Sequence, residues 1–401
     1  MGNGSEMTGS LAEFALGFAV ELVGRGYRPR SVTAQLELME QASEWLATRG
    51  LGAGELSEEL MEGLMAELRR SGRSRLYSPR ALLPLLEYLR WLGATPLAVA
   101  VVPVTAVDEI VERYSSYLLQ RRCLAPSTVR KYVETARVFL GWCEMTAGSI
   151  DLTRLDSAAV SAFVLEQARR SCVASAKCVV TRLRSLLRFL YLEGEIEAAL
   201  ADAVPSVAGW RSQGLVKALD RGSVARLLRG CDRRTRVGRR DHAVITLLSR
   251  LGLRAGEVAA LRLADIDWRS GELLVRGKGS RQERLPLPAD IGETLAGWLE
   301  RGRPRRDSMF VFMHMRAPYV ALSAGAVSQI VGRACQRAGL PPVGAHRLRH
   351  TAATEMLRAG ASLIEVGQVL RHRSRDVTSI YAKVDRGALV AVVQPWPGSP
   401  A

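Results

Sequence analysis

The first two hundred residues repeat one helical layout, and this repeat most constrains the fold. Five pairs of segments match in order: 28–32 with 125–129, Trp45 with Trp142, Leu56-Ser57 with Leu155-Asp156, Arg69-Arg70 with Arg169-Arg170, and 87–93 with 188–194. Two unrelated helical bundles with similar turns would also give such matches. The tryptophan and a proline-started helix coincide in register, so we favour a tandem duplication. We expect two helical domains, at residues 1–98 and 105–205.

Apolar residues at helical spacing predict four helices in the first copy, over about 12–23, 31–45, 57–70 and 78–92. Ser31 is expected to cap the second of these helices. The apolar run from Leu97 to Val107 is too short to cross a membrane and contains Pro103. We interpret it as a linker between the two copies.

The C-terminal part, residues 215–401, follows a linker over 205–214 and shows a different pattern. Three short strands are expected over 266–268, 273–276 and 284–287, separated by Gly271 and a Gly277-Lys-Gly279 turn. Helices are expected over 241–249, 323–338, 348–359 and 362–370, with Gly339 and Gly360 at helix ends. The predicted fold is therefore mainly α, with two helical N-terminal domains and a small antiparallel β-sheet in an α+β C-terminal domain.

Charge points to a polyanionic partner. The net charge is +16, and nine Lys and Arg between residues 217 and 240 have only Asp220 and Asp232 among them. Such a run favours contact with nucleic-acid phosphates. A genome that prefers arginine codons would produce part of the same excess, so charge supports this interpretation without deciding it.

The six cysteines lack the paired spacing of a zinc site. They read as reduced thiols of a cytoplasmic protein. The N-terminus has no basic signal region. We therefore expect a soluble, cytoplasmic protein with no metal, no cofactor and no membrane association.

Three of the five histidines, His346, His350 and His372, lie in one short window that ends at Tyr381. Arg349 lies within the same window. Arginine forks match phosphate oxygens, and histidine moves protons near neutral pH. A tyrosine hydroxyl becomes a nucleophile when nearby cations lower its pKa. The window therefore indicates phosphate chemistry.

This window resembles the active site of the tyrosine recombinases, also called phage-type integrases. Two further motifs stand upstream in the family's order: 251–257, which contains Arg254 and Glu257, and 276–286, which contains Lys278. Five motifs in order are a specific signal. The resemblance covers the C-terminal half strongly and the middle of the chain more loosely.

The resemblance implies a role for each residue. Arg254 and Arg349 would clamp the scissile phosphate, and Lys278 would protonate the 5′-oxygen that leaves. His346 would contact the phosphate and help to move the tyrosine proton, and His372 would donate to a phosphate oxygen. Tyr381 would attack phosphorus and form a 3′-phosphotyrosyl link. Glu257 and His350 would support these groups.

These residue types suit the reaction, because the negative charge that builds on the phosphate oxygens must be stabilised by arginines or by metal ions. The sequence has no carboxylate cluster suited to two metals, so the arginine route is preferred. One position departs from the family: Arg371 stands where glycine is usual before His372. Either its φ angle differs from that of the glycine, or its side chain adds a phosphate contact.

The second helical copy resembles the family's core-binding, SAM-like domain, which closes one side of the DNA. Five basic residues are candidates for DNA contacts: Arg130, Lys131, Arg137, Arg182 and Arg184. A solvated helix face explains any one of them equally well.

We therefore predict a site-specific DNA recombinase or integrase of a phage or mobile element. Its partners would be double-stranded DNA and, in synapsis, three further copies, with related recombinases or accessory proteins as additional partners. A type IB topoisomerase-like enzyme and a cleavage-deficient DNA-binding accessory protein are the alternatives. An RNA-binding or scaffold protein of helical repeats would explain the duplication but not the catalytic residues. The first copy is expected to lengthen the DNA footprint, and the apolar segment 387–393 to dock on a neighbouring subunit or on its own domain.

Overall fold

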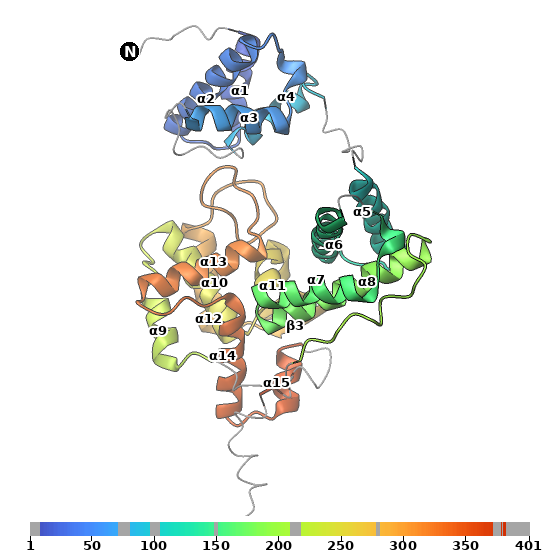
Figure 1. Ribbon diagram of the computed structural model, residues 1–401. Coiled ribbons are helices and arrows are strands. Elements are labelled where there is room, and N and C mark those ends of the chain that lie inside the picture. Colours follow the sequence, from blue (N-terminus) through green and yellow to red (C-terminus); the bar gives the residue numbers. More distant parts are fainter. Residues whose placement is uncertain are drawn as a thin grey trace, which may run out of the picture. The chain divides into compact units, whose positions relative to one another are not determined.

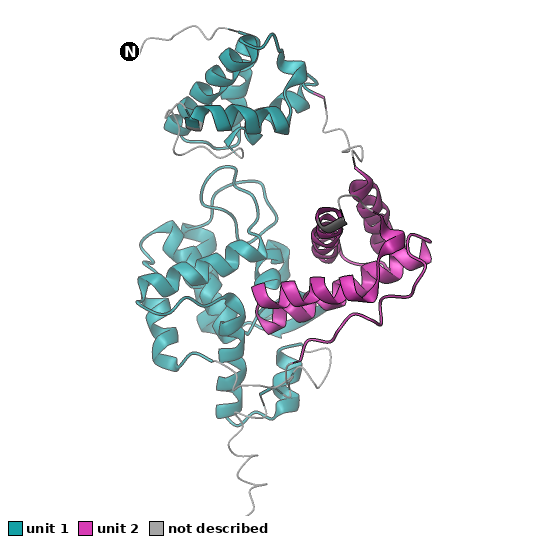
Figure 2. Ribbon diagram, in the orientation of Figure 1, with its two compact units in different colours: residues 1–95, 214–401 teal, residues 96–213 magenta. Residues whose placement is uncertain are grey.

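The computed structural model describes residues 9–70, 81–96, 105–147, 151–208, 218–277, 281–371, 378, 380 and 381. The fold is mainly helical with one small sheet, as predicted (Figure 1). The chain divides into two compact units, residues 96–213 and residues 1–95 together with 214–401 (Figure 2). The described residues form three large hydrophobic cores within 11–89, 107–204 and 227–348, and a smaller cluster within 353–381 that contains Tyr381. None of the described helices is both long enough and apolar enough to cross a membrane.

The first copy begins with a 3₁₀ turn at Ala12–Phe14 and contains four helices: α1 Ala15–Gly24, α2 Pro29–Ala47, α3 Glu58–Arg70 and α4 Leu83–Trp91. The predicted cap at Ser31 is wrong, because α2 begins two residues earlier with Arg28 as N-cap. Proline is well suited to this first helical position, since its fixed φ fits a helix and its missing N–H would lack a partner there. Part of the helix expected from residue 78 lies outside the described residues.

The second copy contains α5 Ala106–Ser116, a π-helical turn at Tyr117–Arg121, α6 Pro126–Ala147, α7 Ser157–Arg170 and α8 Val173–Leu192. The linker expected to reach Val107 is shorter than predicted. Thr105 caps α5 by accepting the Asp108 N–H, and Val107 is buried in the core of this copy.

The two copies share internal contacts as well as helix order. Trp45 Nε1 donates to Glu67 Oε2 at 2.8 Å, and Trp142 Nε1 donates to Glu166 Oε2 at the same distance. An aromatic pair joins the first and last helices of each copy, Phe18 with Tyr88 and Tyr114 with Phe189, at ring distances of 5.4 and 5.1 Å. Side-chain contacts repeated in register support the predicted duplication.

The C-terminal part is built on a helical scaffold with one sheet. Its elements are α9 Arg221–Arg229, α10 Arg236–Arg250, α11 Ala255–Ala260, β1 Ile266–Asp267, β2 Glu272–Arg276, β3 Gln282–Pro286, α12 Ala289–Arg301, α13 Ala324–Arg337, α14 Ala345–Arg358 and α15 Leu363–Val369. The strands pair antiparallel in chain order, with Leu273 opposite Leu285. Leu273 and Val275 point into the core because alternate residues of a strand share a face.

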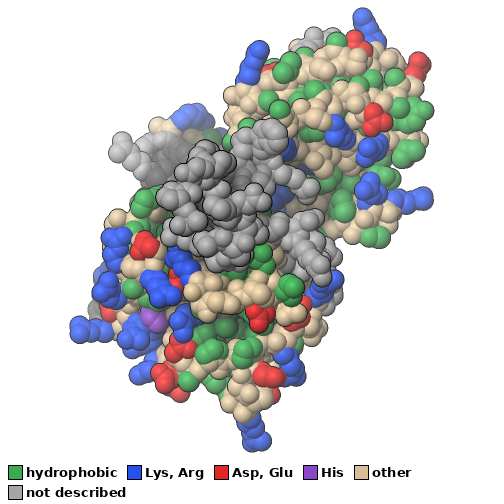
Figure 3. Space-filling view, turned by 90° about the horizontal axis from the view of Figure 1, so that it is seen from below, with side chains coloured by type: hydrophobic (Ala, Val, Ile, Leu, Met, Phe, Trp, Pro, Cys, Tyr) green, Lys and Arg blue, Asp and Glu red, His purple; other side chains and the backbone are tan. Residues whose placement is uncertain are grey.

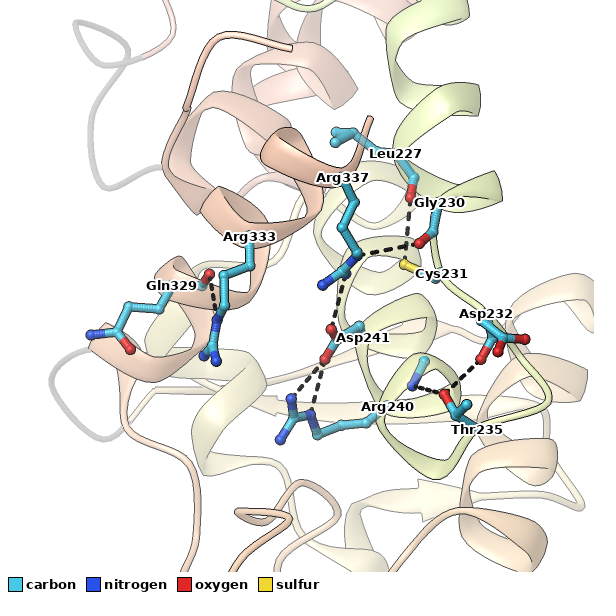
Figure 4. A network of polar contacts seen from close by, with 11 residues as sticks. Leu227, Gly230, Cys231, Asp232, Thr235, Arg240, Asp241, Gln329, Arg333 and Arg337 are labelled. Atoms are coloured by element: carbon cyan, nitrogen blue, oxygen red, sulfur yellow. Dashed lines mark hydrogen bonds and ion pairs between the residues drawn. The ribbon is translucent and has the colours of Figure 1, made fainter. Parts of the chain in front are cut away.

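Helix α10 lies at the centre and packs against α12, α13 and α14. Near its start, the buried Asp241 accepts from Arg240 at 2.7 Å and from Arg337 of α13 at 3.1 Å (Figure 4). Arg337 also donates to the Gly230 carbonyl after α9. These contacts fix α10, and the end of α10 leads directly to Arg254.

The helix ends at Gly339 and Gly360 have φ angles of +64° and +95°, the left-handed conformation that favours glycine there, as predicted. Helix α14 begins at Ala345 rather than at residue 348. This earlier start places His346 in the first turn of the helix, one turn before Arg349 and His350.

Candidate active site

Arg254 and Glu257 are hydrogen-bonded to each other at the start of α11. Arg254 is the N-cap residue, and Glu257 accepts both its backbone N–H at 2.8 Å and its Nη1 at 2.6 Å. Burial alone would raise the pKa of Glu257, but Arg371 and Arg254 hold that pKa below its ordinary value. Glu257 is therefore a buried carboxylate that fixes the direction of the Arg254 side chain.

Arg349 of α14 is 1% exposed and joins three segments. Its Nη1 donates to the Gly252 carbonyl at 2.6 Å, and its Nη2 donates to the Leu370 carbonyl. Gly252 has a φ of +60°, and a Cβ there would lie 2.5 Å from the Leu370 side chain. Burial, with Arg254 nearby, lowers the pKa of Arg349 to about 10, so the guanidinium stays charged at neutral pH.

His350 contacts the candidate nucleophile. Its Nδ1 lies 2.6 Å from the Tyr381 hydroxyl, and Tyr381 is 1% exposed. Burial raises the pKa of Tyr381 to about 12, which Arg349 partly opposes. Burial, followed by His346 and the neighbouring arginines, lowers the pKa of His350 to about 4. These values fit a neutral imidazole that accepts a hydrogen bond from the phenol.

His346 is exposed on the same face of α14, and its ring centre lies 4.3 Å from that of His350. Partial burial, Arg349 and Arg254 lower its pKa. The family resemblance implies that His346 helps to move the tyrosine proton and that His350 has a supporting role, whereas in this structure His350 contacts the Tyr381 hydroxyl. The spacing of these histidines already signalled the shared face, because residues four apart on a helix are neighbours.

A cavity of about 160 Å³ lies beside Arg254 and is lined by Arg254, Glu257, Val275, Gly277, Arg281, Glu283 and Arg371. Lys278 and His372 lie outside the described residues, so their placement stays a prediction. Their described neighbours Gly277 and Arg371 both border this cavity.

Arg371, which departs from the glycine usual in the family, has an unusual backbone conformation. Its φ is +56°, in the left-handed region that glycine adopts readily. Arg371 therefore places a side chain where the backbone favours a residue without one.

The five DNA-binding candidates of the second copy differ in their surroundings. Arg130 and Lys131 are exposed on α6, and Arg137 is exposed but pairs with Asp108 at 2.5 Å. Arg182 is half-buried and donates to the Thr135 hydroxyl at 3.4 Å. Arg184 donates to the Val204 carbonyl at 2.8 Å, which occupies its guanidinium within the domain. Arg130 and Lys131 are thus the best placed to meet a phosphate.

The basic run of the C-terminal part lines a second, larger hollow. This hollow of about 610 Å³ is bordered by basic side chains that include Arg229, Arg233, Arg234, Arg239 and Arg301. Lys and Arg side chains, with acidic ones among them, are also spread over the face shown in Figure 3. Among the described residues, no group of three or more His, Cys, Asp or Glu is arranged to hold a metal ion.

Sequence comparison identifies relatives over nearly the whole chain. Residues 217–387 match the phage integrase family, and residues 111–194 match the phage integrase N-terminal SAM-like domain. The chain is 41% identical over 394 residues to y4rA, an integrase/recombinase by name, of Sinorhizobium fredii (strain NBRC 101917 / NGR234), covering 97% of this chain and 95% of the relative. It is 27% identical over 293 residues to the tyrosine recombinase XerD of Listeria monocytogenes serotype 4b (strain F2365), covering 70% and 95%.

Solved structures share the fold. The XerH site-specific recombinase bound to palindromic difH substrate aligns with a TM-score of 0.57 at 21% identity, covering 78% of this chain and 94% of that one. A lambda integrase tetramer bound to a Holliday junction aligns with a TM-score of 0.52 at 18% identity, covering 77% and 86%. Fold, site and relatives together define a tyrosine recombinase, an enzyme class that breaks and rejoins DNA strands. The chain belongs to the phage integrase family.

Proposed function

We propose that this protein is a site-specific recombinase that cuts and rejoins duplex DNA through Tyr381, in the service of a phage or other mobile element. One observation carries the proposal: the Tyr381 hydroxyl rests on His350, and the charged Arg349 lies on the same helix beside it. A nucleophile, a proton acceptor and a buried cation are thereby gathered on one helix face.

In the proposed reaction the Tyr381 oxygen forms a bond to phosphorus while the bond from phosphorus to the 5′-oxygen breaks. A phenol whose pKa is about 12 needs a proton acceptor at neutral pH. His350 Nδ1 is already within hydrogen-bond distance, and His346 stands next to it. Arg254 and Arg349 balance the charge that builds on the non-bridging oxygens.

Lys278 supplies a proton to the departing 5′-oxygen, and His372 donates to the phosphate. The product is a 3′-phosphotyrosyl link and a free 5′-hydroxyl. Because the link keeps the energy of the broken bond, a 5′-hydroxyl from another strand can reverse the step without ATP. Strand exchange then follows from two rounds of cutting and rejoining.

We further propose three domains, at residues 1–98, 105–205 and 215–401, of which the second closes on DNA through Arg130 and Lys131. The separate hydrophobic cores support this division. A synaptic tetramer on two DNA sites is proposed by analogy with the lambda integrase tetramer bound to a Holliday junction. Related recombinases or accessory proteins would be its other partners.

The test uses DNA that spans the ends of the element carrying this gene, with a nick beside the cut site so that the short fragment escapes and the intermediate is trapped. We expect an adduct that survives SDS with the wild type but not with Tyr381→Phe. Tyr319→Phe, the same change at a half-buried tyrosine of the C-terminal part, is the matched control and keeps the adduct. Tight binding of this DNA without any adduct would favour the cleavage-deficient accessory protein.

A further inference from the structure

Arg371 occupies a backbone position that suits glycine. It follows the last turn of α15, its N–H donates to the Gln368 carbonyl at 2.9 Å, and its φ is +56°. Any side chain with a Cβ is strained in this conformation. Such strain persists only where the surroundings hold the residue, and it gathers at functional sites. The side chain of Arg371 therefore needs an explanation.

The guanidinium of Arg371 is buried and held from two sides. Its Nη2 donates to Glu257 Oε2 at 2.8 Å, and its Nη1 donates to the Val369 carbonyl at 2.9 Å. The side chain is only 5% exposed. Its Nε is also buried and has no hydrogen-bond partner in the described part of the chain. A buried donor without an acceptor is costly, so this atom marks a place where an acceptor belongs.

Arg371 also borders the cavity beside Arg254. Arg371 lines this cavity of about 160 Å³ together with the cationic Arg254 and Arg281 and the carboxylates of Glu257 and Glu283. Three guanidiniums thus face two carboxylates, and the buried Arg349 adds a further positive charge that interacts with Arg254 and Arg371. The excess of positive charge fits an anion with several oxygen acceptors.

We propose that Arg371 is a third phosphate-binding arginine of the active site, whose Nε donates to a non-bridging oxygen of the scissile phosphate. This inference rests on the proposed function. Glu257 and the Val369 carbonyl hold the guanidinium in place before DNA arrives, so its contribution requires no reorganisation during the reaction. Arg371 would then be a catalytic residue, in addition to Arg254 and Arg349.

The rival explanation is that Arg371 only ties Glu257 to the end of α15. Arg371→Gly removes the guanidinium and relieves the backbone strain, and Glu257 keeps Arg254 as its other partner. Arg371→Lys keeps the positive charge but loses the Nε donor. Both variants are compared with the wild type as full-length chains.

The experiment measures the rate of adduct formation on the nicked DNA in single turnover. We expect Arg371→Gly to melt below the wild-type temperature, because the buried Glu257 loses one of its two arginine partners. We expect it to form the adduct about 100-fold more slowly, with Arg371→Lys between the two. The measurement is repeated with a methylphosphonate at the scissile position, which carries no charge. There the difference between wild type and Arg371→Gly should shrink to a few-fold. A difference that stays at its full size would establish the tie to Glu257 instead.

A second measurement does not depend on cleavage. Inorganic phosphate is added in place of chloride at equal ionic strength, and the melting temperature of each protein is recorded. Phosphate should raise the melting temperature of the wild type more than that of Arg371→Gly. Equal shifts would overturn the phosphate site even where no DNA is cut, whereas a wild type that forms no adduct would count against the proposed function alone.

Discussion

Glu257→Gln tests how the active site is held together. The Glu257 carboxylate is 3% exposed and serves the Arg254 N–H, Arg254 Nη1 and Arg371 Nη2, at 2.8, 2.6 and 2.8 Å. Glutamine keeps an oxygen for the N–H but turns an amide toward a guanidinium and removes the negative charge. Arg371 would then be a buried cation without a counter-charge.

Removing one partner of a buried ion pair costs about 3–5 kcal/mol. Arg254 is 39% exposed and regains water, so the lower end, about 3 kcal/mol, applies. For a domain of 150–250 residues each kcal/mol lowers the melting temperature by about 2–4 °C, which gives a fall of about 6–12 °C. The assay is scanning calorimetry of the full chain, following the transition that contains the C-terminal domain.

Glu272→Gln is the matched control, since the Glu272–Arg284 pair of the same domain is exposed at 39% and 61%. Its loss should stay under about 1 kcal/mol. Because the pKa of Glu257 is lowered in the fold, its stabilisation is present above the ordinary carboxyl pKa and is lost as the pH falls through the folded value. A fall under about 2 °C at neutral pH, or one equal to that of Glu272→Gln, would refute the assigned role of Glu257.

Three further predictions follow. His350, whose pKa is lowered to about 4, resists protonation in the folded state, so the wild type should lose about 1–2 kcal/mol between pH 6.5 and 4. His350→Asn keeps an acceptor for Tyr381 and should lose less over this range; an identical pH profile would contradict the assignment. Replacing Arg130 and Lys131 with alanine should lower the slope of log affinity against log salt by about 1–2, and an unchanged slope would exclude their phosphate contacts. Deleting residues 1–98 should leave the length of the DNA footprint unchanged, and a shorter footprint would show that the first copy binds DNA.

Local pattern was enough to predict most of the elements that carry the site. The glycines between the strands, with the alternation of apolar and polar residues, located the three strands. The glycines after α13 and α14 ended those helices as expected. The predicted start of α2 was wrong because serine is a common N-cap residue, which favoured a start at Ser31. The helix begins instead at Pro29, since proline suits the first helical position. Such competition between two valid start signals cannot be ranked from the sequence alone.

Contacts between distant segments were not predictable in the same way. His350 and Tyr381 are 31 residues apart, and their hydrogen bond depends on how the segment after α15 returns to α14. The buried pair of Arg371 with Glu257 likewise joins residues 114 positions apart. The sequence identified the chemical types at the site, but the fold decides which side chain touches which.

The predicted duplication would explain why the two helical copies share internal contacts but differ at their surfaces. Both retain the Trp–Glu hydrogen bond and the aromatic pair between first and last helix, because these hold the bundle together. Aligning Pro29 with Pro126 places Thr33, Ala34 and Glu40 at the positions of the basic candidates Arg130, Lys131 and Arg137.

Acidic residues also slightly outnumber basic ones over residues 1–98, so the first copy lacks the net positive charge that favours DNA binding. Several of its exposed residues are large and apolar: Leu16, Val20 and Val23 lie on one face of α1, and Trp91 ends α4. The sequence alone suggested that this copy lengthens the DNA footprint. The side chains at the matched positions favour the opposite outcome, so we expect the deletion to leave the footprint intact.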